Sequence, residues 1–308
     1  MIITRTPLRI SFIGGGTDLK CFYENHGGAI VNAAIDKYVY VMVKERFLKH
    51  HHYMNHPFIQ EAMKMVNIKG GIDIYSWNDL PHGNGLGSSG SYLVGLLKAL
   101  YSYRGIHISG DELAEAACKI EIDILDAPVG KQDQYVAVYG GLRYYSFGEN
   151  GVDKAILNLS YLQGQNLNSR LMLFYLGITR TSESILKEQV KNTDKIVSLL
   201  KYVRDQAIGL KELAGGNDLD IFGKVMNRGW QKKKGFASNI TTPEIDAYYD
   251  SAMRAGAIGG KVVGAGGGGF LLFYVPEKYQ THVRDALGDL KELPFNIVDE
   301  GSKVLQWT

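Results

Sequence analysis

Residues 81–90 read Pro81-His82-Gly83-Asn84-Gly85-Leu86-Gly87-Ser88-Ser89-Gly90. Glycine lets backbone N–H groups approach an anion closely and adopts positive φ without strain. A helix is predicted next, over 91–103, because its leucines recur on one stripe and Gly105 follows as a stop signal. The N-terminus of such a helix adds free N–H donors and the positive end of the helix dipole. The pattern favours a phosphate-binding loop, and a tight turn with a serine N-cap is the plain alternative.

A dinucleotide-binding loop is a second alternative for the same glycines. Residues 85–90 match G-x-G-x-x-G, and Asp111 follows at a suitable spacing. However, Pro81, His82 and Asn84 separate the glycines from the β-like residues 72–77, and Asp111 opens a helix instead of ending a second strand. The G-x-x-x-x-G-K-[ST] pattern and the H-R-D and D-F-G motifs of protein kinases are absent from the sequence. The dinucleotide hypothesis is therefore the weaker one.

Two further glycine clusters require an explanation. The first, Gly14-Gly15-Gly16-Thr17-Asp18, follows a short predicted strand, and the other, Gly264-Ala265-Gly266-Gly267-Gly268-Gly269, lies between two predicted strands. We expect Gly267 and Gly268 where backbone passes close to phosphate or adopts positive φ. The alternative is that these glycines only complete a tight hairpin.

Glu121 and Asp133 are candidate carboxylates for chemistry at the phosphate loop. A helix is predicted over 110–126, and Glu121 borders its apolar stripe of Leu113, Ala117, Ile120 and Ile124. An inward carboxylate needs a cation, a hydrogen-bond network or protonation. Asp133 lies in a polar turn at 130–134. A helix-edge ion pair and an N-cap are the plain alternatives, but together with the loop the two residues suggest a magnesium ligand and an acid–base group.

The composition excludes several classes of function. The 308 residues include 34 basic and 32 acidic side chains, and this balance gives no electrostatic reason for a nucleic-acid or membrane partner. The run Lys232-Lys233-Lys234 is interpreted as a solvated helix face. His50, His51, His52 and His56 lack metal-ligand spacing and are interpreted as a polar loop.

The setting is expected to be the cytoplasm. Cys21 and Cys118 are too few for a disulfide framework, the first residues lack a signal-peptide pattern, and no apolar run approaches a membrane span of about 20 residues. The sequence allows either a monomer or a homodimer.

Strands and helices intermingle along the chain, which predicts an α+β protein with domains at 1–168 and 169–308. Strands are predicted near 9–13, 29–35, 38–43, 72–77, 140–147, 170–176 and 294–299. Besides the two helices already described, helices are predicted near 181–193, 195–213, 218–229, 242–256 and 278–290. A glycine-rich hairpin is predicted over 260–275.

The three glycine clusters, in this order, resemble those of the GHMP kinases, which include galactokinase, homoserine kinase, mevalonate kinase and phosphomevalonate kinase. The P-x-x-x-G-L-G-S-S signature of that family is present from Pro81 to Ser89, and its C-terminal glycine motif is similar to residues 261–269. The resemblance implies an N-terminal domain like ribosomal protein S5 domain 2, a C-terminal ferredoxin-like domain and an active site between them.

The resemblance also implies roles for individual residues. ATP phosphates would lie in the loop, with Mg²⁺ on Ser89 and Glu121, and Asp133 would lie near the accepting hydroxyl. Arg9 and Asp18 reproduce the spacing of a galactokinase arginine and sugar-binding aspartate. The implied cofactor-binding residues are Pro81, Gly83, Gly85, Leu86, Gly87, Ser88, Ser89 and Gly90. The implied substrate-binding residues are Gly15, Gly16, Thr17, Asp18, Arg180, Gly267 and Gly268, and the implied catalytic residues are Asp133 and Arg9.

One departure from galactokinase points to the substrate. Gly15 and Gly16 replace a glutamate and a histidine, which removes a galactose contact and opens space. The sequence of residues 9–18, together with that of residues 177–182, looks most like the corresponding motifs of bacterial D-glycero-α-D-manno-heptose 7-phosphate kinases, and L-fucokinase shares part of this pattern. The resemblance implies phosphorylation of the C1 hydroxyl of a seven-carbon sugar phosphate in nucleotide-activated heptose synthesis. Arg180 is the first candidate for the terminal phosphate, and Lys131 and Lys37 are weaker ones. A kinase for an unphosphorylated sugar and a non-catalytic sugar sensor are the alternatives.

Overall fold

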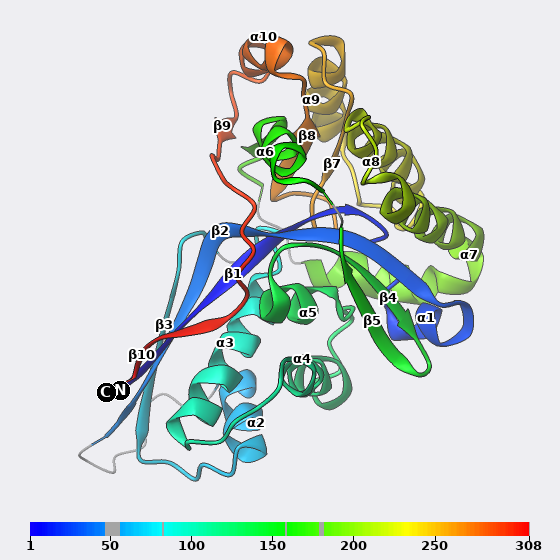
Figure 1. Ribbon diagram of the computed structural model, residues 1–308. Helices are drawn as coiled ribbons and strands as arrows, with labels where there is room; N and C mark the ends of the chain where they lie inside the picture. Colours follow the sequence, from blue (N-terminus) through cyan, green and yellow to red (C-terminus); the bar gives the residue numbers. More distant parts are fainter. Residues whose placement is uncertain (47–55, 82, 158, 179–181, 308) are drawn as a thin grey trace.

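The computed structural model describes residues 1–46, 56–81, 83–157, 159–178 and 182–307. Figure 1 shows two layered parts, each built on an antiparallel sheet. The strands are β1 (Ile2–Ile13), β2 (Gly28–Glu45), β3 (Ile72–Asn78), β4 (Leu142–Gly148), β5 (Gly151–Ile156), β6 (Leu171–Tyr175), β7 (Gly259–Val262), β8 (Phe270–Tyr274), β9 (Lys291–Glu292) and β10 (Lys303–Trp307). The helices are α1 (Lys20–His26), α2 (Pro57–Met65), α3 (Ser88–Tyr103), α4 (Gly110–Cys118), α5 (Gln132–Tyr139), α6 (Tyr161–Ser169), α7 (Ser182–Leu213), α8 (Asp220–Lys233), α9 (Pro243–Arg254) and α10 (Gln280–Ala286). A π-helix (Lys119–Ile124) follows α4, and a 3₁₀ turn (Glu277–Tyr279) precedes α10.

The larger sheet has the order β10-β1-β2-β4-β5, with β3 also paired to β2. The helices α2, α3, α4 and α5 lie on one side of it in Figure 1. The side chains of α3 that point to β1 and β2 are fully buried, among them Leu93, Leu96, Leu97 and Leu100. This apolar stripe is the one that the sequence predicted, and it anchors the helix whose N-terminus borders the phosphate loop.

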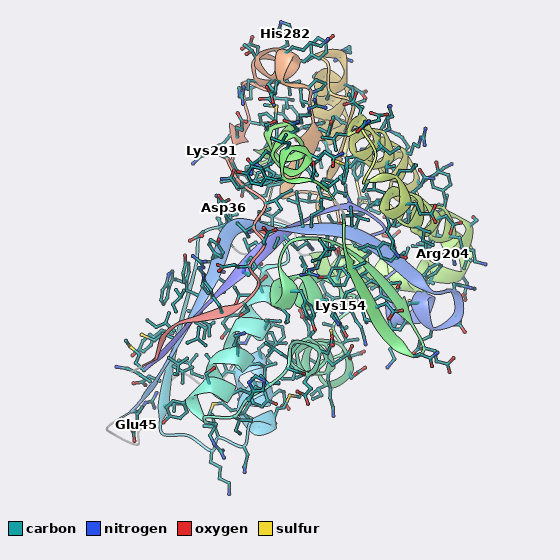
Figure 2. The ribbon with its side chains drawn as sticks, in the orientation of Figure 1. Asp36, Glu45, Lys154, Arg204, His282 and Lys291 are labelled. Atoms are coloured by element: carbon teal, nitrogen blue, oxygen red, sulfur yellow. The ribbon has the colours of Figure 1, made fainter. Side chains whose placement is uncertain are left out.

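The smaller sheet has the order β7-β8-β6-β9. The helix α8 packs on β7 and also touches β1, while α7 packs on β2 of the larger sheet. Arg204, labelled in Figure 2, holds α7 to the end of α1, because its Nη1 donates to the carbonyl of His26 at 2.5 Å. These helices therefore connect the two sheets around the region where the glycine clusters meet.

Most predicted elements are present, and several capping predictions are confirmed. Ser109 and Glu112 form a capping box at α4, and Thr242 caps α9 with Pro243 in the first turn. The hairpin predicted over 260–275 is the antiparallel pair β7–β8. The helices predicted near 181–193 and 195–213 are one helix, in which the Thr193 hydroxyl donates to the carbonyl of Gln189 one turn earlier.

The predicted helix over 110–126 is wrong in its second half, which is a π-helix from Lys119. A π-helical turn holds an extra residue, so it rotates the following side chains relative to the α-helical stripe. As a result Ile124 is 45% exposed, whereas Glu121 is only 2% exposed. The polar turn predicted at 130–134 is also wrong from Gln132 onwards, because those residues open α5.

The last strand was predicted near 294–299, and this is wrong. That segment makes one isolated bridge, between Ile35 and Ile297, and the final strand β10 pairs with β1. Asp36, labelled in Figure 2, holds the returning segment by accepting bonds from the backbone N–H and the side-chain amide of Asn296, both at 2.9 Å. The domain boundary at 168/169 stays a prediction, although the C-terminal strand lies in the larger sheet.

No helix within the described ranges has both the length and the apolar character that crossing a membrane requires.

Candidate functional site

A cavity of about 530 Å³ opens where the three glycine clusters meet. It is lined from both parts of the molecule: the loop before α3, the turn after β1, the start of α5, and residues of α7, α8 and the β7–β8 hairpin. The polar or glycine residues of its wall include Arg9, Gly15, Gly16, Asp18, Gly83, Gly85, Gly87, Ser88, Ser89, Gln132, Asp133, Gln189, Lys233 and Gly264.

Alternate glycines shape the loop at 81–90. Gly83, Gly85 and Gly87 all have φ between +74° and +80°, a region that other L-residues rarely adopt. The buried Asn84 side chain holds the loop from inside, since its Nδ2 donates to the Pro81 carbonyl and its Oδ1 accepts the Leu86 N–H, each at 2.8 Å.

The helix α3 begins at Ser88 with Gly87 as its N-cap, and no side-chain cap bond is formed. The serine N-cap alternative is therefore wrong. Ser88 and Ser89 lie in the first helical turn, where backbone N–H groups have no partner within the helix. Gly87, Ser88 and Ser89 line the cavity, as a phosphate loop requires. Pro81, Leu86 and Gly90 support the loop without lining the cavity.

The third glycine cluster lets the hairpin approach the phosphate loop. A Cβ on Gly85 would lie 2.7 Å from the Val263 carbonyl oxygen, and one on Gly264 would lie 2.6 Å from that of Gly85. Gly264 borders the cavity. Gly267 and Gly268 lie deeper: the Gly267 N–H already donates to Ile240 at 2.7 Å, and Gly268 packs against Ile178. The predicted contact of these two glycines with substrate stays a prediction, and the hairpin alternative explains their positions.

Arg9 and Asp133 form a bidentate ion pair beside the loop. Arg9 Nε lies 2.8 Å from Asp133 Oδ1, Nη2 lies 3.0 Å from Oδ2, and Nη1 donates to the Gly85 carbonyl at 2.6 Å. A Cβ on Gly87 would lie 3.3 Å from Asp133 Oδ2, and one on Gly90 only 2.8 Å from its Cβ. Glycine at 87 and 90 thus allows a carboxylate to lie directly against the phosphate loop.

Glu121 is buried next to Ser89 and Gln134. Its Oε2 accepts a bond from Gln134 Nε2 at 2.6 Å. Burial raises the pKa of Glu121 to about 7 and the Asp133 charge adds to this, while hydrogen bonds from Ser89 and Gln134 oppose it. The predicted pair of Ser89 and Glu121 is therefore brought together, by the first turn of α3 and the π-helix.

Asp18 lines the cavity next to Gln132 and is 1% exposed. It accepts backbone N–H bonds from Gly16 at 3.0 Å and Gln132 at 3.2 Å. Burial and the charge of Asp133 raise its pKa. The neighbouring Thr17 is fully buried, and its hydroxyl donates to the carbonyls of Gly14 and Ala29, so it shapes the turn without lining the cavity.

The prediction that Gly15 and Gly16 open space is confirmed at Gly15, where a Cβ would meet no atom closer than 3.9 Å, and it is wrong at Gly16. A Cβ on Gly16 would lie 2.3 Å from Nε2 of Gln189, a residue of α7 that is 2% exposed. Among the described residues that Nε2 finds no hydrogen-bond partner, and neither do Gln132 Oε1 and Ser11 Oγ nearby. These buried polar groups suit the hydroxyls of a ligand. Gln189 was missed by sequence reasoning, because its helix comes from a distant part of the chain.

Lys233 was also missed, and its assignment to a solvated face is wrong. It is 6% exposed and lines the cavity, whereas Lys232 is exposed. The Lys233 ammonium donates to the Gly264 carbonyl. Burial and the nearby Arg9 lower the pKa of Lys233 to about 8.

The remaining predicted residues have other outcomes. Arg180 and His50 to His52 lie outside the described residues. His56 caps α2 by accepting the Phe58 N–H and borders the cavity. Lys37 and Lys131 form ion pairs with Asp36 at 2.8 Å and with Glu115 at 2.9 Å. Among the described residues no three His, Cys, Asp or Glu side chains form a group that could hold a metal ion.

Comparisons with known proteins agree with this geometry. Residues 49–141 match the GHMP kinases N terminal domain and residues 208–292 match the GHMP kinases C terminal domain, together more than half of the chain. The chain is 27% identical to a D-glycero-alpha-D-manno-heptose 7-phosphate kinase of Campylobacter jejuni, over 93% of each protein.

Solved structures of related proteins share the fold. A D-glycero-D-manno-heptose 1-phosphate kinase from Bacteroides thetaiotaomicron superimposes with a TM-score of 0.80 at 24% identity, over 100% of both chains. Lactococcus lactis galactokinase complexed with galactose gives a TM-score of 0.79 at 17% identity, over 98% of this chain and 94% of the other.

Proposed function

This chain belongs to the GHMP kinase family, and from that premise we propose that it phosphorylates the C1 hydroxyl of D-glycero-D-manno-heptose 7-phosphate. The predicted α+β class and GHMP kinase fold are confirmed, and the chain is an ATP-dependent sugar kinase. The acceptor, the product (a 1,7-bisphosphate) and a place in nucleotide-activated heptose synthesis are the proposal. The observation that carries the proposed phosphoryl transfer is the Asp133 carboxylate, held by Arg9 against the phosphate loop.

In the proposed reaction Asp133 receives the proton of the attacking hydroxyl. Arg9 fixes both carboxylate oxygens through a planar two-point contact, so the carboxylate keeps one orientation while lone pairs stay available. The acceptor oxygen forms a bond to the γ-phosphorus of ATP, and the bond from that phosphorus to the bridging oxygen of ADP breaks. Phosphoryl transfer depends mainly on positioning and charge stabilisation, which a rigid Arg9–Asp133 pair beside the loop would supply.

The residues present fit a magnesium ion. Mg²⁺ takes one or two carboxylates together with waters and phosphate oxygens, and does not need a cage of protein ligands. Ser89 and Glu121 offer one hydroxyl and one buried carboxylate at the entrance of the loop, and a cation there would offset the cost of the buried Glu121 charge. A magnesium ion held by Ser89 and Glu121 would supply positive charge beside the phosphates.

Several observations support a polyhydroxylated acceptor in the part of the cavity that Asp18, Gln132 and Gln189 line. Asp18 and the unpaired amide groups of Gln132 and Gln189 are buried there, and each has capacity for hydroxyl hydrogen bonds. The seven-carbon, terminally phosphorylated acceptor rests on the Campylobacter jejuni relative. Arg180 stays the candidate for its terminal phosphate, since both weaker candidates, Lys37 and Lys131, are engaged in ion pairs.

A kinase of an unphosphorylated sugar is the second candidate. The chain is 25% identical, over 91% of its length, to an L-fucokinase/L-fucose-1-P guanylyltransferase of Bacteroides fragilis, of which it covers 35%. A non-catalytic sensor on the same fold is disfavoured, because a sensor has no need for Ser89, Glu121 and Asp133 together.

The test is an ADP-release assay over heptose 7-phosphate, free heptose, fucose, galactose and mevalonate, with phosphorus NMR of the product. We expect the highest kcat/KM with heptose 7-phosphate and a new phosphate on C1. Faster turnover of a free sugar would overturn the acceptor while leaving the kinase activity standing. Binding of sugar and ATP without turnover of any compound would favour the sensor.

A further inference from the structure

Lys233 ends α8 with its ammonium group inside the molecule. The side chain is 6% exposed and borders the cavity. An ammonium group has three hydrogen-bond donors. Among the described residues its one partner is the Gly264 carbonyl, so two donors stay available on the cavity side.

The charge of Lys233 has no direct counter-ion. Its neighbours in sequence are engaged: Lys234 pairs with Asp246 at 2.6 Å, and Lys232 lies over the Tyr202 ring at 5.2 Å. In the described part of the chain no carboxylate forms an ion pair with Lys233. Burying a charge without a partner is unfavourable. We therefore expect the Lys233 ammonium to pair with a bound ligand.

Other titratable groups around Lys233 make this environment more positive. Arg9 on β1 and the buried Lys261 on β7 both repel it, and the charge of Asp18 attracts it. The same repulsion, added to burial, lowers the pKa of Lys261. Asp133 is already paired with Arg9. The wall that α8 and the hairpin form is thus electropositive, and it suits an anion.

The position of Lys233 indicates which anion this wall would bind. Its partner Gly264 lies in backbone contact with Gly85 of the phosphate loop. The Gly85 carbonyl in turn accepts a 2.6 Å bond from Arg9, which holds Asp133. The ammonium group therefore lies at the junction of the loop and the Arg9–Asp133 pair, where the phosphoryl group would pass between donor and acceptor.

We propose that Lys233 is a further catalytic residue, whose ammonium contacts the non-bridging oxygens of the phosphoryl group during transfer. This inference rests on the proposed kinase reaction and extends it. Lys233 keeps its own proton: the hydroxyl proton goes to Asp133, the new bond forms between acceptor oxygen and phosphorus, and ADP leaves with the electrons of the broken bond. A fixed cation placed where negative charge accumulates lowers the barrier without reorganisation.

The experiment compares Lys233→Met, Lys233→Arg and the matched control Lys232→Met in the full-length protein. Binding of ADP and of the non-hydrolysable analogue AMP-PNP is measured by calorimetry with magnesium. Turnover is measured by ADP release with whichever acceptor the wild type uses. Thermal unfolding verifies that each variant is folded.

We expect Lys233→Met to weaken AMP-PNP binding at least tenfold while ADP binding changes less than twofold, because only AMP-PNP carries a γ-phosphoryl group. The kcat should fall by ~10²–10³-fold, as for loss of one preorganised donor. Lys233→Arg should recover part of both losses, and Lys232→Met should match the wild type.

Equal weakening of ADP and AMP-PNP binding by Lys233→Met would overturn the proposal, and so would unchanged binding and kcat. An increase in acceptor KM with unchanged kcat would also overturn it, by placing Lys233 at the acceptor's own phosphate. If Lys233→Met does not fold, the test rests on Lys233→Arg, which keeps the positive charge. A folded Lys233→Arg variant that binds AMP-PNP like the wild type but has no activity would overturn the proposed contact with the phosphoryl group. Failure of the proposed function can be told apart from failure of this inference. In the first case the wild type would turn over no sugar, but the effect of Lys233→Met on AMP-PNP and ADP binding would still test the role of Lys233.

Discussion

Replacing Asp133 by Asn should reduce stability and activity by two separable mechanisms. The Arg9 side chain is 5% exposed and that of Asp133 21%, with both contacts at hydrogen-bond distance. Removing one partner of a buried ion pair typically costs ~3–5 kcal/mol, because the other charge stays buried without compensation. Asn keeps the shape and one acceptor, and the carboxylate is partly solvated, so we expect a loss of roughly 3 kcal/mol in the free energy of unfolding. The Lys233 charge adds to this loss, because it repels the Arg9 guanidinium.

The assay is a double-mutant cycle in urea: wild type, Asp133→Asn, Arg9→Gln and the double variant. With both charges removed, neither partner of the Arg9–Asp133 pair is left buried and unpaired, so the double variant should be more stable than the sum of the single losses predicts, by roughly 2 kcal/mol. Asp123→Asn is the matched control, because its pair with Lys20 is half exposed on both sides and surface pairs contribute ~1 kcal/mol or less.

Activity should follow a different pattern from stability. The loss of the proton acceptor should lower kcat by ~10²–10⁴-fold in Asp133→Asn, with ATP affinity near that of the wild type. The double variant should recover stability and not activity. Single losses that add within about 0.5 kcal/mol would refute the coupling. A kcat for Asp133→Asn within about threefold of the wild type, with chemistry rate-limiting, would refute the catalytic role.

Three further predictions concern the metal pair and the acceptor wall. Burial raises the pKa of Glu121 to about 7, so the folded protein holds a proton that the unfolded chain releases; in magnesium-free buffer, wild-type stability should fall as pH rises from about 4.5 through 7. Glu121→Gln should remove this dependence. The change in the free energy of unfolding between pH 5 and pH 8, measured in urea, should therefore differ by roughly 2 kcal/mol between wild type and variant. Parallel pH profiles of the two proteins would contradict the burial argument. Ser89→Ala should raise the magnesium concentration for half-maximal rate several-fold, and an unchanged magnesium titration would assign the ion to other groups. Gly16→Ala should raise the acceptor KM by displacing Gln189. The control is Gly105→Ala, at a glycine that also has positive φ but whose added Cβ would meet no atom within 4 Å, and it should change only stability. Equal acceptor KM values in the two variants would show that the contact between residue 16 and Gln189 has no role in acceptor binding.

Local patterns in the sequence were sufficient for the helices and loops whose signals lie within a few residues. The glycine alternation at 83–87 and the leucine stripe after it predicted a glycine loop that leads into a helix, and the structure has this arrangement; phosphate binding by the loop stays a prediction. The capping signals at Ser109 and Thr242 were equally local and correct. Such signals survive folding because they depend on backbone geometry and on neighbours one turn away.

The site itself depended on contacts that no local pattern encodes. The π-helix decides that Glu121 is buried and Ile124 exposed, which is the reverse of what a regular helix would give for Ile124. The position that a Cβ on Gly16 would take is occupied by the amide of Gln189, which comes from a helix more than 170 residues later.

The sequence by itself was sufficient to predict the family, the glycine loop and the candidate carboxylates, because each depends on a short run of residues whose local geometry has a physical meaning. Only the tertiary structure decided which charges face the cavity. Lys232, Lys233 and Lys234 are identical in type, yet the packing of α8 against β1 and β7 buries one of them and leaves Lys232 exposed. The cost of burying a charge depends on the three-dimensional positions of its partners, here Arg9, Asp18 and Gly264, and these come from distant parts of the chain.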